Sequence, residues 1–156
     1  MKKPVLDQII ELLDSENIEY KLTEHEAVRT SEEAARVRGV DIKTGAKAMV
    51  VKSKDEYFLL VLPASKRINW RKVKDALGAK EIRFATEEEA EKVTNVQMGA
   101  VPPFGNIIGI PTYFDEEITR IEQLNFNPGS RTHSISMKSA DLIRVVNPVV
   151  ISLTET

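Results

Sequence analysis

The chain has 156 residues, 42% of them hydrophobic, with 22 Lys and Arg residues against 24 Asp and Glu residues. This length suits one domain that buries about two thirds of its unfolded surface and needs no metal or disulfide to fold. The balanced charge excludes a general nucleic-acid coat protein, and the absence of cysteine excludes a disulfide framework and a cysteine nucleophile. We expect a single domain over residues 1–156 in the cytoplasm, with no export signal, no membrane partner and no DNA partner.

In the first part of the chain, helical and extended patterns alternate. Pro4 stands where a helix can begin, and apolar residues recur at helical spacing as far as Ser15, so this helix is expected to cover a sheet. Thr30 and Glu33 form a capping box for a second helix that Gly39 can end. Extended segments are predicted at Glu19–Leu22, Ala46–Lys52 and Tyr57–Leu62. The last two segments flank a turn-like tetrapeptide and predict a β-hairpin near the centre of the sheet.

The rest of the chain predicts shorter elements. Helices are predicted at Asn69–Leu77, Thr86–Val93 and Ser139–Val145, and strands at Glu81–Phe84, Ile107–Ile110, Thr112–Asp115, Leu124–Phe126, Ser134–Met137 and Val149–Leu153. This order indicates the α+β class. It favours a mixed, strongly curved sheet with helices laid on one side over a doubly wound parallel sheet.

Two irregular loops indicate a site. The first, Gly99–Gly105, combines Pro, which fixes the backbone, with Gly, which permits close approach, so it is typical of a preset pocket wall. The second, Asn127–His133, leads into a predicted strand. Metal chemistry is not predicted, because Glu24, His25 and Glu26 share no helical face and a zinc site needs three or four ligands. We therefore expect no metal and no cofactor.

Lys47 is the most informative single charge. Strand alternation places it on the same face as the apolar Met49 and Val51. A buried ammonium is costly unless a phosphate, a carboxylate or a carbonyl meets it. A lysine at a sheet edge can instead extend its side chain to water, and the spacing alone does not decide between the two.

A basic run from Lys66 to Lys74 contains Trp70 and could bind RNA through a stacked base. The solvated face of a short helix, with Trp70 partly packed, is the favoured interpretation of this run.

Together, Lys47 near the start of a central strand, the Gly-x-x-x-Pro element at Gly99–Pro103 and the Asn-x-Gly-Ser element at Asn127–Ser130 resemble the YbaK/ProX family of aminoacyl-tRNA deacylases. The resemblance extends over nearly the whole chain and includes the editing domain inserted in bacterial-type prolyl-tRNA synthetases. It implies a single α+β domain with a curved, mixed, mostly antiparallel and barrel-like sheet flanked by helices. The implied activity is hydrolysis of the ester of a mischarged tRNA, typically alanine or cysteine on the proline tRNA.

The resemblance also implies a set of site residues. The catalytic residues are Lys47, Gly99, Gly129 and Ser130, and the substrate-binding residues are His25, Val101, Pro103, Phe104, Asn127 and His133. We expect the loop backbones to hold the ester carbonyl and the amino acid, while the lysine binds the terminal phosphate or sugar. The implied partner is the acceptor end of the tRNA, with or without a synthetase beside it. The alternatives are a non-catalytic module of the same fold that binds a tRNA end or a synthetase, and loops with a purely structural role.

Overall fold

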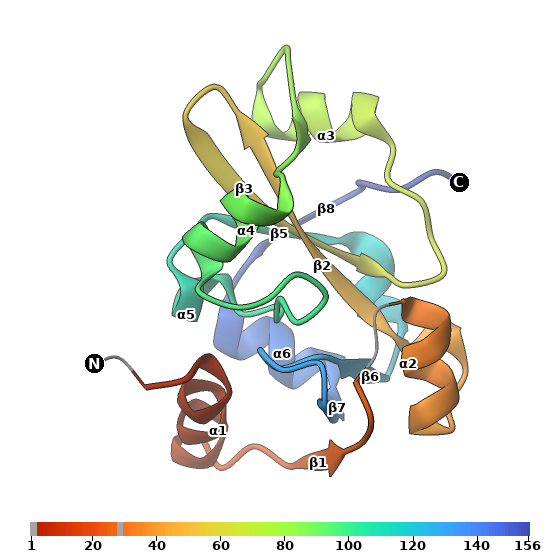
Figure 1. Ribbon diagram of the computed structural model, residues 1–156. Coiled ribbons are helices and arrows are strands. Elements are labelled where there is room, and N and C mark those ends of the chain that lie inside the picture. The colour runs from red at the N-terminus through yellow and green to blue at the C-terminus, as the bar shows by residue number, and fades with distance from the viewer. Residues whose placement is uncertain (1–2, 28–29) are drawn as a thin grey trace.

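The computed structural model describes residues 3–27 and 30–156, whose strands form two sheets (Figure 1). The strands are β1 (Tyr20–Glu24), β2 (Ala46–Ser53), β3 (Glu56–Pro63), β4 (Arg83–Phe84), β5 (Thr112–Asp115), β6 (Gln123–Phe126), β7 (His133–Lys138) and β8 (Val149–Ile151). The α-helices are α1 (Val5–Ser15), α2 (Ser31–Arg38), α3 (Trp70–Leu77), α4 (Glu87–Thr94), α5 (Gly105–Ile108) and α6 (Ser139–Val146), and the 3-10 helices are η1 (Ile42–Thr44) and η2 (Glu116–Arg120).

The larger sheet is mixed and has the order β4-β2-β3-β5-β8. The predicted hairpin is confirmed near its centre, with β2 and β3 paired from Ala46 opposite Pro63 to Ser53 opposite Glu56. The other side of β3 pairs with β5 in parallel, and β5 pairs in parallel with β8. The start of β2 thus pairs with the end of β3, while β4 borders only the far end of β2, at Val51 and Lys52.

The smaller sheet is antiparallel and has the order β1-β7-β6. It meets the larger sheet at an isolated bridge between Gly45 and Asn125, just before β2 begins. The strand orders of the described residues leave both sheets open, so the single barrel-like sheet expected from the sequence is replaced by two sheets joined near this bridge.

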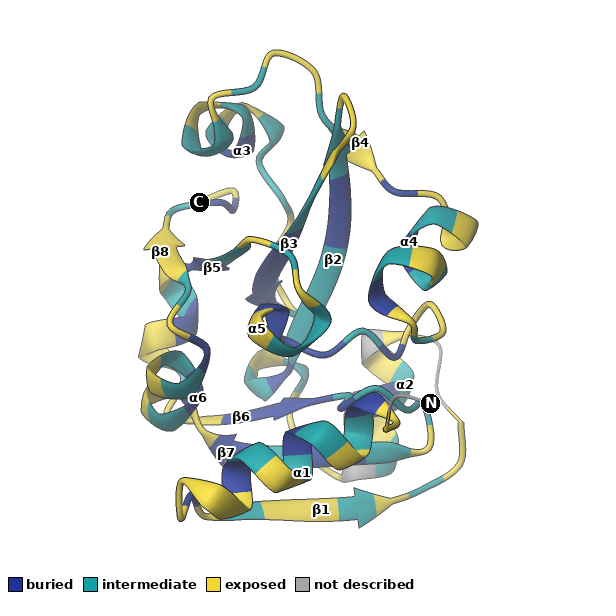
Figure 2. Ribbon diagram, turned by 90° about the vertical axis from the view of Figure 1, so that its left-hand side faces the viewer, coloured by how far each residue is buried: buried dark blue, intermediate teal, exposed yellow. Residues whose placement is uncertain are grey.

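Two hydrophobic cores lie on opposite faces of the hairpin. Successive strand residues point to opposite faces, and accordingly Val50 belongs to the larger core while Val51 belongs to the smaller one. The larger core also includes Val5, Ile9 and Leu13 of α1, which is the helix predicted to cover a sheet (Figure 2). The smaller core lies against α3, the helix that contributes Val73.

The helix starts follow the predicted capping residues. Thr30 and Glu33 form the capping box of α2, and Thr86 and Glu89 form that of α4. Glu89 also accepts hydrogen bonds from Arg83 and Lys52 on the neighbouring strands. These donors, led by Arg83, hold the pKa of the Glu89 carboxyl far below its usual range. The carboxylate thereby fixes α4 to the hairpin.

The prediction of a strand at Ile107–Ile110 is wrong, because Ile107 and Ile108 form the second half of α5 and Gly109 ends that helix. Its isoleucines favour strands by propensity, but Gly109 ends the helix in the left-handed conformation with a φ of 82°. The turn is tight, since a Cβ at Gly105 would lie 1.4 Å from Thr112 Oγ1. The predicted strand Glu81–Phe84 shortens to β4.

Among the described residues, no helix combines the length and the apolar character that crossing a bilayer requires.

Candidate functional site

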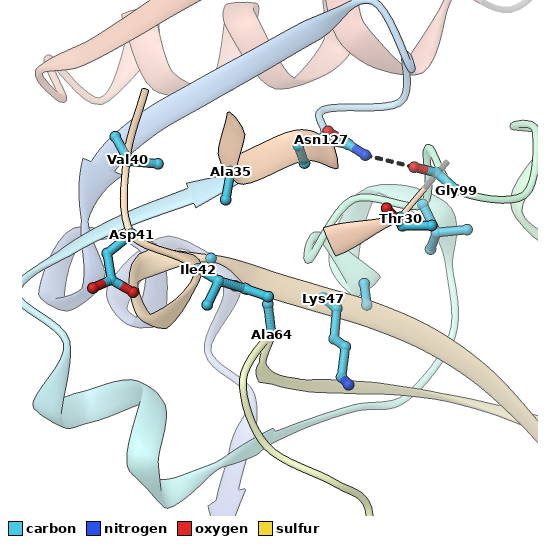
Figure 3. A pocket seen from close by; sticks show the side chains of 14 residues that line it. Thr30, Ala35, Val40, Asp41, Ile42, Lys47, Ala64, Gly99 and Asn127 are labelled. Atoms are coloured by element: carbon cyan, nitrogen blue, oxygen red, sulfur yellow. Dashed lines mark hydrogen bonds between the residues drawn. The ribbon is translucent and has the colours of Figure 1, made fainter. Parts of the chain in front are cut away.

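A cavity of about 150 Å³ lies between α2, the start of β2 and the two irregular loops (Figure 3). Its lining residues are Thr30, Ala34, Ala35, Val40, Asp41, Ile42, Gly45, Ala46, Lys47, Ala48, Ala64, Gly99, Val101 and Asn127. The five alanines among them explain why space remains at this point of a packed domain. A cavity with such walls accepts a small group and excludes a large one.

The two loops predicted to form a site are joined by hydrogen bonds. The side-chain amide of Asn127 donates to the Gly99 carbonyl at 2.5 Å, and the backbone N–H of Gly129 donates to the Ala100 carbonyl at 2.9 Å. Segments nearly thirty positions apart therefore form one wall, which Figure 3 shows beside the cavity. Because its links involve backbone groups, the wall has a defined shape without a large side chain.

Glycine is required at two points of this wall. Gly99 has a φ of 90° and Gly129 a φ of 87°, in the region that disfavours residues with a Cβ. A Cβ at Gly129 would also lie 3.0 Å from Val5 Cγ1, at the first turn of α1. The second loop is therefore pressed against the N-terminal helix, which limits how far it can move.

Lys47 projects from β2 at the cavity and is half buried. Burial lowers the pKa of its ammonium group, Glu32 opposes that shift and Arg67 adds to it. Within residues 3–27 and 30–156, no hydrogen bond or ion pair engages its Nζ. In the view of Figure 3 the side chain points away from Asn127 and Gly99. It offers a charge that an anion at the cavity mouth can meet.

The two histidines lie behind the second loop and not among the lining residues of the cavity. His133 Nδ1 lies 2.9 Å from Ser130 Oγ, and its Nε2 lies 3.3 Å from the carboxylate of Glu24. His25 Nδ1 donates to the Glu26 carbonyl at 2.7 Å, and its Nε2 lies 2.7 Å from Ser134 Oγ. These contacts tie the end of β1 to the start of β7 and so support the loop.

The structure separates the predicted site residues into the two histidines just described and three further groups. Lys47, Gly99, Val101 and Asn127 line the cavity. Gly129 and Ser130 line a wider groove beside α1, of about 560 Å³. Pro103 and Phe104 are buried, and the Phe104 ring packs 5.7 Å from the Phe126 ring in the larger core. In the described chain, no cluster of three or more His, Asp or Glu side chains is arranged to hold a metal.

Sequence reasoning missed the side of the cavity formed by α2 and η1. Thr30, Ala34 and Ala35 come from the start and face of α2, and Asp41 caps η1 by accepting from the Lys43 N–H. The signal in the sequence was weak: α2 has little apolar surface, yet its adjacent alanines are buried.

Three comparisons with known proteins identify the family and the fold of the chain. Residues 25–145 match the model of the aminoacyl-tRNA editing domain. The chain is 27% identical to the multifunctional Ser/Thr-tRNA deacylase ProXp-y of Escherichia coli strain K12, and the match covers 96% of this chain and 92% of that protein. It is 29% identical to a part of the proline–tRNA ligase of Caldicellulosiruptor saccharolyticus, and this match covers 74% of the chain and 19% of the ligase. A solved structure described as a candidate trans-editing enzyme for prolyl-tRNA synthetase has the same fold, with a TM-score of 0.84 and 23% identity over 100% of both chains.

Proposed function

The chain belongs to the aminoacyl-tRNA editing domain family, and on that premise we propose that it hydrolyses the ester between an amino acid and the 3′ end of a mischarged tRNA. The observation that carries the proposal is the small cavity at which Lys47 and the two joined loops meet. The name of the E. coli relative, a tRNA deacylase matched along nearly its whole length, supports hydrolysis in trans. Such an enzyme acts in the cytoplasm, where tRNA is charged.

The loops supply the groups that ester hydrolysis needs. An aminoacyl ester is already activated, so a positioned water and hydrogen-bond donors for the developing oxyanion are sufficient to accelerate its loss. The N–H of Gly129 already donates to Ala100, which gives Gly129 a positioning role. In the described chain the N–H groups of Gly99 and Val101 donate to no protein acceptor, so we assign the oxyanion contacts to them.

Lys47 is assigned to the tRNA. Its ammonium has no hydrogen-bond or ion-pair partner in the described chain and stands at the edge of the cavity. A terminal phosphate or ribose oxygen would provide the counter-charge or acceptor that the half-buried group lacks. The ribose hydroxyl next to the ester is then placed to help move the proton.

The size of the cavity sets the amino acids that we propose. Alanine side chains on several walls leave about 150 Å³, which suits a small amino acid such as the alanine or cysteine of a mischarged proline tRNA. Serine and threonine are the second candidates, favoured by the name of the E. coli relative and by Thr30 in the lining. One methylene is worth only about 1–3 kcal/mol in such a pocket, so discrimination among these four is narrow.

Hydrolysis rates of alanyl-, cysteinyl-, seryl-, threonyl- and prolyl-tRNA, all on the proline tRNA, test the proposal. We expect alanyl- or cysteinyl-tRNA to be hydrolysed fastest and Lys47→Ala to slow it about 100-fold. Lys80→Ala, at an exposed lysine away from the cavity lining, is the control and should act as wild type. A preference for seryl- or threonyl-tRNA would select the second candidates. No hydrolysis of any of the five would overturn the proposal in favour of a non-catalytic binding module.

A further inference from the structure

A partly exposed aromatic pair stands at the edge of the larger sheet, outside the cavity. Phe84 of β4 packs edge-to-face on Trp70, the first residue of α3, with ring centroids 4.8 Å apart. Phe84 is nevertheless 47% exposed, an unusual state for a phenylalanine on a sheet. Figure 2 shows β4 as an exposed edge strand at the end of the molecule that carries α3. Phe84 is thus the exposed member of the pair, whereas Trp70 also packs against the smaller core.

The strand register connects this pair with the cavity. Val51 of β2 lies directly opposite Phe84, and residues directly opposite in an antiparallel pair share a face. Lys47 shares that face too, because it precedes Val51 by an even number of residues. Between them the face is covered, since Val51 is fully buried in the smaller core, so the register gives the spacing of the two ends and not an open surface. At the usual rise of a strand, Lys47 and Val51 lie about 13 Å apart along β2. A stacked single strand covers that distance with about four nucleotides, and an extended one with fewer.

A loop also connects the cavity with the aromatic pair. It starts at Ala64, which lines the cavity, and ends at Trp70. Backbone hydrogen bonds from Glu155 to Arg67 and from Asn69 to Leu153 attach the loop to the C-terminal segment. The loop is thus held in place between the two features.

The basic residues of this region divide into two kinds. Lys72 donates to Ser152 Oγ at 3.0 Å and to the Thr154 carbonyl at 2.9 Å, so it serves the fold. Arg67 and Arg71 are exposed, and neither side chain has a hydrogen-bond or ion-pair partner within the described ranges. Arg67 also lies close enough to Lys47 to lower the pKa of that lysine. Two guanidinium groups without a partner in the described ranges therefore lie between the cavity and the aromatic pair along the chain, one on the connecting loop near Lys47 and one next to Trp70.

We propose that Arg67, Trp70, Arg71 and Phe84, the aromatic strip, bind the single-stranded 3′ end of the tRNA just before its terminal nucleotide. A base stacks on the aromatic pair, and the two arginines neutralise the neighbouring phosphates. The inference rests on the proposed function, which places the terminal nucleotide at the cavity. A protein partner is less well matched, because the strip offers one exposed aromatic side chain among cations and no broad apolar patch.

Trp70 is the only tryptophan of the chain, so its fluorescence reports directly on the strip. The probe is an uncharged acceptor-stem minihelix with its unpaired 3′ nucleotides, compared with the same minihelix lacking them. We expect the first to quench Trp70 and the second to bind at least tenfold more weakly. Phe84→Ala should weaken binding of the first minihelix about tenfold, while Phe84→Tyr retains it.

Matched variants separate stacking from charge. Arg67→Gln should weaken binding and reduce its salt dependence, whereas Arg120→Gln, at an exposed arginine of η2, should change neither. Val149→Ala removes an exposed apolar side chain of β8 and should bind as wild type. Phe84→Leu keeps the apolar bulk, so a loss of binding in this variant assigns the effect to the ring.

The outcomes distinguish this inference from the proposed function. Equal binding of the two minihelices, or wild-type binding by a folded Phe84→Ala variant, would overturn the inference even if Lys47→Ala abolishes hydrolysis. Loss of synthetase binding in Phe84→Ala with RNA binding intact would overturn it in favour of a protein-docking role. Ring-dependent quenching by the unpaired end would support it even if no charged tRNA is hydrolysed.

Discussion

The cavity and the aromatic strip are both reached from β2, but they are built from different kinds of group. The cavity is bounded by small side chains and backbone groups, and the hydrogen bond from Asn127 to Gly99 fixes its wall. The strip consists of large side chains, two of them surface arginines that have no partner among the described residues. A rigid small space can select by volume, whereas stacking and charge tolerate many ligands. In our account, selection of the amino acid and affinity for the tRNA end are therefore separable.

Filling the cavity is expected to give the largest effect, because it should slow hydrolysis without weakening the binding of the tRNA end. Ala35 faces the cavity from α2 and is nearly fully buried, and leucine preserves helix propensity there. Ala35→Leu should slow hydrolysis of the preferred aminoacyl-tRNA about 100-fold, because the amino acid loses its space. The minihelix should still quench Trp70 as in wild type.

Ala140→Leu is the matched control for that change, at an exposed position of α6. It should hydrolyse the same substrate at the wild-type rate. Unchanged hydrolysis by a folded Ala35→Leu variant would show that the amino acid binds elsewhere.

Removing one of the wall glycines gives a medium effect. Gly129→Ala should lower the free energy of unfolding by about 2 kcal/mol, since it adds backbone strain and crowds Val5. Gly109→Ala, where φ is 82° and no atom lies within 4 Å of the new Cβ, should cost about 1 kcal/mol from strain alone. Denaturant unfolding of the two variants measures the difference. Equal losses would mean that the second loop is not pressed against α1.

Alkaline pH is expected to have the smallest effect, and to change hydrolysis at the cavity without changing binding at the aromatic strip. Burial lowers the pKa of Lys47 below its ordinary value of 10.5, so the charged form is lost earlier as pH rises. Hydrolysis per bound tRNA should fall a few fold through that interval, after correction for spontaneous ester loss. The arginines of the strip stay charged throughout, so quenching of Trp70 by the minihelix should persist.

The same Lys47 shift has the opposite sign for stability. The folded state disfavours the ammonium form, so this group alone makes the protein more stable as pH rises from the lowered pKa toward 10.5. A hydrolysis rate that rises with stability over this range would contradict a role for the charged lysine.

Much of the fold could be predicted because its signals are local. The hairpin follows from strand composition around a turn, and the helix starts at Thr30 and Thr86 follow from capping boxes whose reciprocal hydrogen bonds the structure contains. The error at α5 has the opposite origin, because the tight packing of Gly105 against Thr112 outweighs the strand propensity of the isoleucines.

The candidate site could be predicted only in part. Lys47 and the Gly99 and Asn127 loops carry unusual residue types, so they could be singled out one by one. Their joining depends on tertiary hydrogen bonds, and the alanines of α2 carry no chemical signal of their own. Phe104 is a residue that the sequence singled out without a place at the cavity. Its distinctive motif suggested substrate contact, but its ring is fully buried in the core.

The central claim is that the aminoacylated 3′ end of the tRNA occupies the cavity at Lys47. Its most direct test is to follow backbone amide chemical shifts while adding a non-hydrolysable 3′-amide analogue of alanyl-adenosine. We predict that Ala46, Lys47, Gly99 and Val101, which line the cavity, shift the most. Shifts confined to the groove at Asn95 and Arg131, or no shifts at saturating analogue, would contradict the account.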